Sequence, residues 1–279
     1  MTTATLVRMN ENRVGTLLRD WRRQRRLSQL DLALEAGVST RHLSFVETGR
    51  SRPSPDMVMH LAEQLQVPLR ERNQLLLAAG YAPQYAAHSL EDPELAPIRD
   101  AVGHVLAGHE PYPAIAVDRG WNLVASNSAL GPLLEGVAPE LLQPPVNCMR
   151  LALHPDGLAP RILNLAEWRG HLLHRLERQI VLTGDSGLRE LHEELLGYPG
   201  PSGSDGSATP SGSDSSASGT EIMVGLRLAT ADGGRLSFFS TVTTFGTAVD
   251  ITVSELSIEA FFPADASTAE ALTALAAVG

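Results

Sequence analysis

The sequence of 279 residues contains no lysine and a single cysteine. Because Cys148 stands alone, an internal disulfide and a zinc site built on cysteines are both excluded, which fits a reducing compartment. The 22 basic side chains are all arginine, a bias that we attribute to a GC-rich bacterial genome. No apolar run approaches the length needed to cross a bilayer, and the N-terminus lacks the apolar segment of a signal peptide. We therefore expect a cytoplasmic protein with no membrane partner.

Signatures of catalysis are also missing from the sequence. It contains no phosphate-binding loop, no G-x-S-x-G elbow and no paired-carboxylate signature. His171 and His174 lie three residues apart on an expected helix, and His192 precedes two glutamates, but the spacing places no third metal ligand. Histidines that face solvent or accept hydrogen bonds are far commoner than ligands. We expect no enzyme and no metal.

Charge is distributed unevenly along the chain, whose net value is −10. Residues 1–80 hold twelve arginines against eight acids, or +4, whereas the remainder holds ten against twenty-four, or −14. A basic face on one module is enough to attract DNA phosphates, while an acidic remainder weakens non-specific DNA binding. Together with the chain length, this asymmetry predicts two domains, residues 1–83 and 84–279.

Residues 28–50 have the pattern of two short helices that meet at a glycine. Ser28 is expected to cap the first helix and Gly37 to end it, and Ser39 and Gly49 bracket the second in the same way. Two helices joined steeply through a glycine turn allow the second to enter the DNA major groove while the first crosses the backbone. The stretch therefore predicts a helix-turn-helix.

Nine residues of this stretch occur in a characteristic order: Gln29, Ala33, Gly37, Val38, Ser39, Leu43, Glu47, Gly49 and Arg50. This order resembles the xenobiotic-response-element family of bacterial regulators, which are relatives of the lambda and 434 phage repressors. The resemblance implies binding to a double-stranded DNA operator. A plain helical hairpin with polar residues facing water is the alternative.

The resemblance assigns side chains of the second helix to two kinds of DNA contact. Thr40, Arg41 and Phe45 occupy the positions that reach base edges, where arginine can grip guanine and phenylalanine can press on a thymine methyl. For Phe45, packing into the domain core is the alternative. Phosphate contacts, which set register and not sequence, are implied for Gln29, Ser39, His42 and Arg50.

An arginine-rich helix precedes the helix-turn-helix, after polar residues 1–12 that we expect to be loose. Its arginines either form a solvated face or contact phosphates; they are Arg13, Arg19, Arg22, Arg23, Arg25 and Arg26. The resemblance gives Arg22 a separate role, a partly buried ion pair with Glu47 that joins two helices. Two more helices, starting at Ser54 and Leu69, complete a five-helix domain.

Beyond residue 84 the pattern changes from helical to alternating. A helix over 98–106 precedes a hairpin with its turn at Asp118–Gly120, and Asn127 is expected to cap a short helix. Helices are expected over 163–182 and in the stretch DSGLRELHEELLGYP. An antiparallel meander is predicted by two stretches that alternate apolar and polar residues, LRLATADGGRLSFFSTVTTF and AVDITVSELSIEAFFP. A closing helix is expected over 267–278. Residues 199–220, rich in glycine and serine, are expected to form a flexible loop.

The strand, turn, strand and helix order resembles a PAS-like sensor fold. The wider order, with LLLAAGYAP before it and NCMRLALHPDGLAP after it, resembles the MmyB-like regulators and their ligand-binding domain. The expected fold class is therefore an all-α five-helix domain followed by an α+β PAS-like domain with an antiparallel sheet.

The resemblance implies a transcription regulator that senses a small-molecule effector. A fatty acid or similar lipophilic molecule suits an apolar cavity with few polar anchors, and no other cofactor is expected. Candidate ligand-binding residues are Trp121, Asn127, Arg150, Trp168 and Phe238, with ordinary core or capping roles as the alternative. A homodimer is expected because one module reads only a few base pairs. A ligand-free dimerisation or protein-interaction module is the alternative for the second domain.

Overall fold

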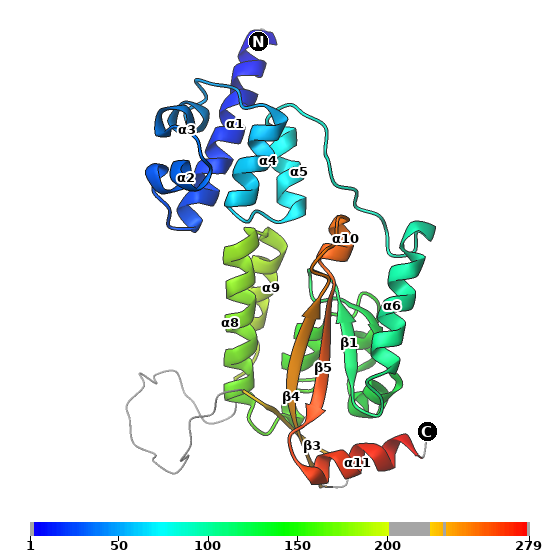
Figure 1. The fold of residues 1–279 in the computed structure, drawn as a ribbon. Coiled ribbons are helices and arrows are strands. Elements are labelled where there is room, and N and C mark those ends of the chain that lie inside the picture. The colour runs from blue at the N-terminus through cyan, green and yellow to red at the C-terminus, as the bar shows by residue number, and fades with distance from the viewer. Residues whose placement is uncertain (1–2, 201–223, 231–232, 278–279) are drawn as a thin grey trace. The chain divides into compact units, whose positions relative to one another are not determined.

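The computed structural model describes residues 3–200, 224–230 and 233–277 (Figure 1). The chain divides into two compact units. The first extends to Ser89 and includes residues 181–184 and 246–254, and the second contains the remainder. Most of the expected glycine- and serine-rich loop, from residue 201 on, lies outside the described residues.

The N-terminal segment of the first unit, up to Ser89, folds into five helices: α1 Thr3–Gln24, α2 Gln29–Glu35, α3 Thr40–Glu47, α4 Pro55–Gln64 and α5 Leu69–Ala78. The expectation that residues 1–12 are loose is wrong from Thr3 onward. Leucine, arginine, methionine and glutamate in that stretch are good helix formers, and no glycine or proline interrupts them before Gly15. The first helix therefore begins before the apolar residues Val14, Leu17, Leu18 and Trp21, from which the sequence predicts it.

The helix-turn-helix is held by the caps that the sequence predicts. Ser28 accepts a hydrogen bond from the Asp31 backbone, and the Asp31 carboxylate accepts one from the Ser28 backbone, which completes a capping box. Ser39 accepts from the His42 backbone at 3.1 Å. Gly37 has a φ of +62°, a left-handed conformation that glycine adopts without steric cost. These caps fix where the second helix of the motif starts.

The core of this unit is aliphatic, apart from one tryptophan, and draws on all five helices. Its most buried members are Leu18, Leu32, Leu43, Leu61, Leu65 and Leu75. The side chains of Leu43 and Val46 on α3 face this core, as their spacing predicts. Arg41 is therefore exposed on the opposite side of the helix.

The second unit contains a five-stranded antiparallel sheet in the order β2-β1-β5-β4-β3, of which β1, β5, β4 and β3 are labelled in Figure 1. Its strands are β1 Ala114–Val117, β2 Leu123–Ser126, β3 Leu226–Ala229, β4 Arg235–Thr244 and β5 Ser257–Pro263. The longer helices of the C-terminal part are α6 Ala96–Ala107, α7 Cys148–Leu153, α8 Leu165–Thr183, α9 Ser186–Leu196 and α11 Ala266–Ala276. Short 3-10 turns are η1 Pro93–Leu95, η2 Ser128–Leu134, η3 Pro139–Leu142 and η4 Ala159–Arg161.

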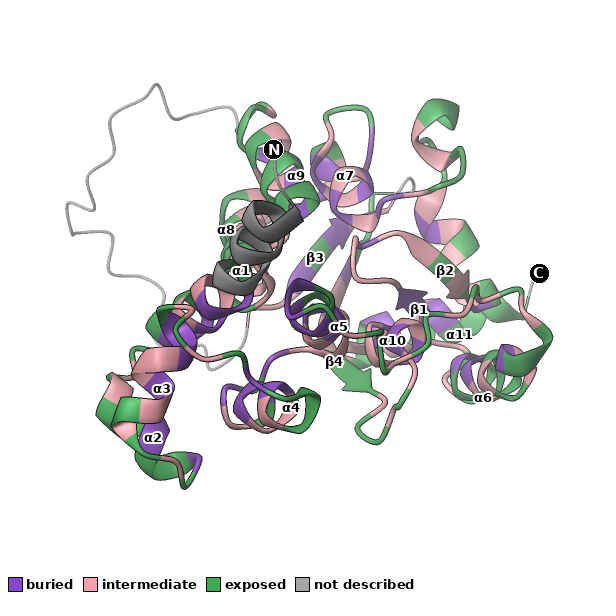
Figure 2. Ribbon diagram, turned by 90° about the horizontal axis from the view of Figure 1, so that it is seen from above, coloured by how far each residue is buried: buried purple, intermediate pink, exposed green. Residues whose placement is uncertain are grey.

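Both faces of this sheet are covered, so β1 is buried along its whole length and appears purple in Figure 2. On one face Ala114 and Ala116 pack against α6. On the other, Ile115 and Val117 belong to a large core with side chains of α8 and α9. Strand side chains alternate between faces, and small residues toward α6 allow that helix to approach closely.

Two sequence expectations about this part of the chain need correction. Residues 251–254 form the short helix α10 rather than a strand, because Asp250 accepts a hydrogen bond from the Val253 backbone and caps it. Asn127 occupies the N-cap position of η2 as expected, but its side chain makes no capping hydrogen bond. Its side chain accepts from the Ala114 backbone and donates to the carbonyls of Leu106 and Tyr112, so it ties β1 to the segment before it.

The expected fold class, an all-α domain followed by an α+β domain with an antiparallel sheet, is confirmed. A five-helix domain precedes an α+β domain whose sheet is antiparallel throughout, with the β1–β2 hairpin and the β3-β4-β5 meander at the predicted places. None of the described helices combines the length and the hydropathy that a membrane span requires.

Candidate DNA-binding surface and ligand cavity

The outward side of α3 carries an aromatic ring between two arginines. The guanidinium carbons of Arg41 and Arg50 lie 5.3 Å and 5.9 Å from the centre of the Phe45 ring. Both arginines are exposed, and Phe45 is partly exposed and does not belong to the core cluster of this unit. A flat apolar ring flanked by two cations suits a DNA edge, because it offers apolar contact and charge together.

Four further predicted DNA-contacting residues lie near this face. Ser39, Thr40 and His42 occupy the first turn of α3, where exposed backbone N–H groups favour an anion such as phosphate. The Ser39 hydroxyl already accepts from the His42 backbone. Gln29 begins α2, and its amide donates to Glu47 at 2.8 Å, so it is tied to the ion pair described next.

Arg22 of α1 and Glu47 of α3 are brought together. The Arg22 Nε donates to Oε1 of Glu47 at 2.7 Å, and the Arg22 Nη2 donates to Oε2 of Glu47 at 2.9 Å. The third nitrogen, Nη1, donates to the Leu27 carbonyl at 2.8 Å. The hydrogen bond to Glu47 raises the pKa of Arg22, and burial opposes that rise. Both side chains are buried. This two-pronged pair fixes the end of α3 against α1.

The other arginines separate into structural and exposed groups. Arg25 donates to the carbonyl of Leu65, and Arg52 to that of Ala79, so each satisfies the last residues of a helix. Arg13, Arg23 and Arg26 are exposed. Exposed guanidinium groups such as these are placed to reach phosphates.

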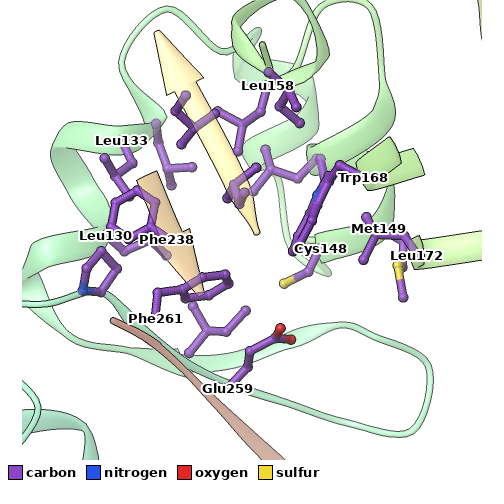
Figure 3. A pocket seen from close by; sticks show the side chains of 18 of the residues that line it. Leu130, Leu133, Cys148, Met149, Leu158, Trp168, Leu172, Phe238, Glu259 and Phe261 are labelled. Carbon is purple, nitrogen blue, oxygen red and sulfur yellow. The ribbon is translucent and has the colours of Figure 1, made fainter. Parts of the chain in front are cut away.

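An apolar cavity of about 90 Å³ lies in the second unit (Figure 3). Its walls are formed by side chains from many elements of this unit, namely β1, β2, η2, α7, α8, β3, β4 and β5. Among the largest are Trp121, Leu133, Met149, Trp168, Phe238 and Phe261. Leucines supply much of the remaining surface, so the lining offers few hydrogen bonds to a ligand.

Three of the five residues proposed for ligand binding line this cavity, namely Trp121, Trp168 and Phe238. Asn127 and Arg150 do not. Asn127 is engaged by three backbone groups, as described above. Arg150 donates to both oxygens of Glu194 at 2.8 Å and 2.7 Å. Its carboxylate partner is thus part of the protein.

Trp121 is also the point where the cavity meets a polar network. Its φ is +66°, at the end of the β1–β2 turn, and its ring nitrogen donates to Gln179 at 2.7 Å. The Arg175 guanidinium lies 4.4 Å from the ring centre and pairs with Glu259. A cation over the tryptophan face is attracted by the ring electrons, so Arg175 is positioned by both the Trp121 ring and the Glu259 carboxylate.

Two polar lining residues were not predicted from the sequence. Glu259 and Cys148 both line the cavity, and Figure 3 shows the carboxylate and the sulfur on the same side of the space. Burial, followed by the charges of Glu259 and Asp118, raises the pKa of Cys148 to about 12. The thiol is therefore protonated near neutral pH and is a poor nucleophile.

Two of the three histidines considered as metal ligands, His174 and His192, lie near the same carboxylate, that of Glu177, whereas His171 packs on a tryptophan. His171 stacks on Trp168 with ring centres 5.5 Å apart, and burial lowers its pKa. His174 is exposed, and His192 lies 3.3 Å from Glu177. Over the described ranges, no three His, Cys, Asp or Glu side chains gather closely enough to hold a metal ion.

The fold and these two sites define a DNA-binding helix-turn-helix protein with a separate α+β ligand-binding domain. Residues 18–72 match the family model "Helix-turn-helix", and residues 98–275 match "MmyB-like transcription regulator ligand binding domain". The second match alone covers more than half of the chain. The chain therefore belongs to the family of MmyB-like transcription regulators, and the family expectation from the sequence is confirmed.

Other comparisons add little. No curated protein matches the chain. One solved structure, described as "Structure of an RNA-binding Light-Oxygen-Voltage Receptor", aligns at 13% identity and a TM-score of 0.27. The alignment covers 96% of this chain, which spans 62% of that protein. A likeness at this TM-score carries no argument about fold or function.

Proposed function

We propose that the protein is a one-component regulator that binds its operator as a homodimer and changes its DNA affinity when a small apolar molecule occupies the cavity. The observation that carries this proposal is the presence, in one chain, of a capped helix-turn-helix with an exposed Arg41–Phe45–Arg50 face and a separate apolar cavity. One element can read DNA and the other can hold an effector.

On the DNA side, α3 enters the major groove with its exposed face toward the bases. Arg41 donates to guanine O6 and N7, Phe45 contacts a thymine methyl, and Thr40 reaches a neighbouring base edge. Arg50 and His42, with the start of α2 at Gln29, hold phosphates on either side. The Arg22–Glu47 pair supports this face from beneath and does not touch DNA.

A dimer follows from the size of the reading module. One helix-turn-helix contacts only a few base pairs, and tight binding in proteins of this architecture uses two half-sites about 34 Å apart. We therefore expect a protected region with two similar halves.

On the ligand side, the cavity volume limits the effector. An engineered apolar cavity of about 150 Å³ holds benzene, and typical ligand pockets begin near 300 Å³. A cavity of about 90 Å³ is smaller than either, so without rearrangement it admits only a compact group of a few carbon atoms. A long-chain fatty acid enters only if the lining leucines and aromatic rings move apart.

This small volume also supports the alternative function, in which the second domain binds no ligand and serves for dimerisation. The two functions differ in what accompanies the purified protein. Solvent extraction followed by mass spectrometry detects a co-purifying apolar molecule if the domain is a sensor. A ligand-free protein that dimerises normally, and whose DNA affinity no extract changes, favours the alternative.

The most informative experiment begins with the protein's own promoter region. Footprinting locates the operator, and fluorescence anisotropy then measures affinity with and without the extracted molecule. We expect two protected half-sites and a change in affinity on adding the extract. Absence of any sequence-specific footprint, with binding that is equal on random DNA, contradicts the proposed regulator.

A further inference from the structure

Glu259 occupies a position in β5 where an apolar residue is expected. Ile258 belongs to the cluster that packs against α6, and Ala260 packs against the same cluster. Residues 259 and 261 face the opposite side, and Phe261 lines the apolar cavity. The alternation therefore sends the Glu259 carboxylate into the cavity wall, where the residue is only 5% exposed.

A buried carboxylate is costly unless the protein supplies partners. Arg175 of α8 donates to both oxygens of Glu259 at 3.2 Å and 3.1 Å, and the Ser240 hydroxyl of β4 donates at 2.8 Å. A carboxylate has about four lone-pair sites for hydrogen bonds. Three are occupied by these neighbours, so about one acceptor site is left over among the residues that the structure describes.

The Glu259 carboxylate lies at the edge of the cavity. In Figure 3 the carboxylate of Glu259 points into the space bordered by Cys148 and Phe261. The protonated Cys148 thiol is a weak donor and acceptor. Every other side chain in the wall is apolar, apart from the indole nitrogens of Trp121 and Trp168. The Trp121 nitrogen already donates to Gln179.

We propose that Glu259 selects a small apolar ligand carrying one hydroxyl group, which donates its hydrogen bond to the free acceptor site of the carboxylate. The proposal rests on the ligand-sensing function proposed above and names its ligand class. An acid is disfavoured because its carboxylate would face Glu259 at close range in a low-dielectric space. An amine is disfavoured because Glu259 is already neutralised by Arg175, so a second cation would be buried without a counter-charge.

The size of the cavity suggests four-carbon probes that differ only in the polar group. 1-Butanol, butyrate and butylammonium are titrated into the full chain at neutral pH, and ligand-observed nuclear magnetic resonance gives the dissociation constants. We expect butanol to bind at least tenfold more tightly than either charged probe. Ala152→Leu, which fills the cavity from its wall, should abolish this binding and controls for contact elsewhere on the surface.

The role of Glu259 itself is tested by variants. Glu259→Gln leaves Arg175 without its counter-charge and can unfold the domain, so the charge-balanced pair Glu259→Leu with Arg175→Leu accompanies it. In the folded double variant the preference for butanol over butyrate should fall below threefold. Circular dichroism verifies the fold of both proteins.

The outcomes separate this inference from the function on which it rests. Butyrate or butylammonium binding as tightly as butanol overturns the hydroxyl selection but keeps a ligand-sensing domain. Failure of all three probes to bind overturns the inference and, with an extract that contains no small molecule, also favours the ligand-free alternative. An unchanged butanol preference in the double variant removes Glu259 as its cause.

Discussion

Removing Glu47 alone should destabilise the helix-turn-helix far more than replacing both members of its ion pair. Glu47 is 1% exposed and Arg22 is 8% exposed. Glu47→Ala leaves the guanidinium buried with the Leu27 carbonyl as its remaining acceptor. Breaking one side of such a pair costs about 3–5 kcal/mol, because an unpaired charge is left in a low-dielectric site.

The double replacement Arg22→Met with Glu47→Leu removes both charges and keeps most of the buried volume. Well-packed apolar side chains in place of a buried ion pair are often neutral or stabilising. The double variant should therefore be at least as stable as the parent protein. Gln29, which loses its partner, is partly exposed and can donate to water.

Urea unfolding of the full chain, followed by far-ultraviolet circular dichroism, measures these differences. Arg23→Met and Glu35→Ala serve as matched controls because both side chains are exposed, and each should change the free energy of unfolding by less than about 0.5 kcal/mol. A Glu47→Ala protein within 1 kcal/mol of the parent would refute the view that this pair joins α1 to α3.

Three further predictions concern packing, reactivity and pH. Gly15→Ala should destabilise the first unit by about 1–3 kcal/mol in thermal unfolding, since its new Cβ would lie 2.3 Å from a carbonyl oxygen of α3. The matched control is Gly170→Ala on α8, whose new Cβ meets nothing within 4 Å and should be neutral or stabilising. An equal loss of stability in the two variants would contradict the close approach of Gly15 to α3. Cys148, with a pKa of about 12, should react with a thiol reagent at pH 8 far more slowly in the native protein than in urea, and equal rates would show an accessible thiolate. The Arg150 hydrogen bond, more than any other cause, holds the pKa of Glu194 below its usual value. The stability difference between the parent and Arg150→Met should therefore be present above the usual carboxyl pKa and decline as pH falls through the depressed value. Because the Arg150 and Glu194 side chains are both more than a third exposed, this stability difference should not exceed about 1 kcal/mol. A stability difference that grows as the pH falls would contradict a depressed pKa of Glu194.

Local chemistry explains why the first unit could be predicted closely. Ser28 and Ser39 each cap a helix through contacts within three residues, and Gly37 adopts a left-handed conformation that other residues avoid. These features depend on neighbours in the sequence. The start of α1 was missed because residues 1–12 are mostly polar in sequence, and the apolar stripe from which the helix was predicted begins only at Val14.

The cavity depended on contacts that no local pattern encodes. In the sequence, Ser257 and Glu259 alternate with Ile258 and Ala260, which predicts a polar face turned to water. The sheet is covered on both sides, so this polar face became a cavity wall. The covering α8 then supplied Arg175, which lies 84 positions away in the sequence.

Arg150 shows the opposite error. An arginine near an expected apolar site suggests an anchor for a ligand carboxylate, but Glu194 of α9 supplies that carboxylate from within the fold. Asn127 does lie at a helix start, as its sequence position indicates, but its amide satisfies three backbone groups outside that helix. Both assignments required knowledge of which distant segments meet.

The central claim, that the exposed face of α3 reads DNA sequence, is tested most directly by comparing Arg41→Ala and Arg50→Ala on operator and random DNA in one buffer. Fluorescence anisotropy gives the affinities, and circular dichroism verifies folding. We predict that Arg41→Ala costs about 1–3 kcal/mol on the operator and much less on random DNA. Arg50→Ala should weaken both DNAs together and lower the slope of log affinity against log salt by about one. If Arg41→Ala weakens both DNAs equally while Arg50→Ala weakens only the operator, the assignment of the reading face is wrong.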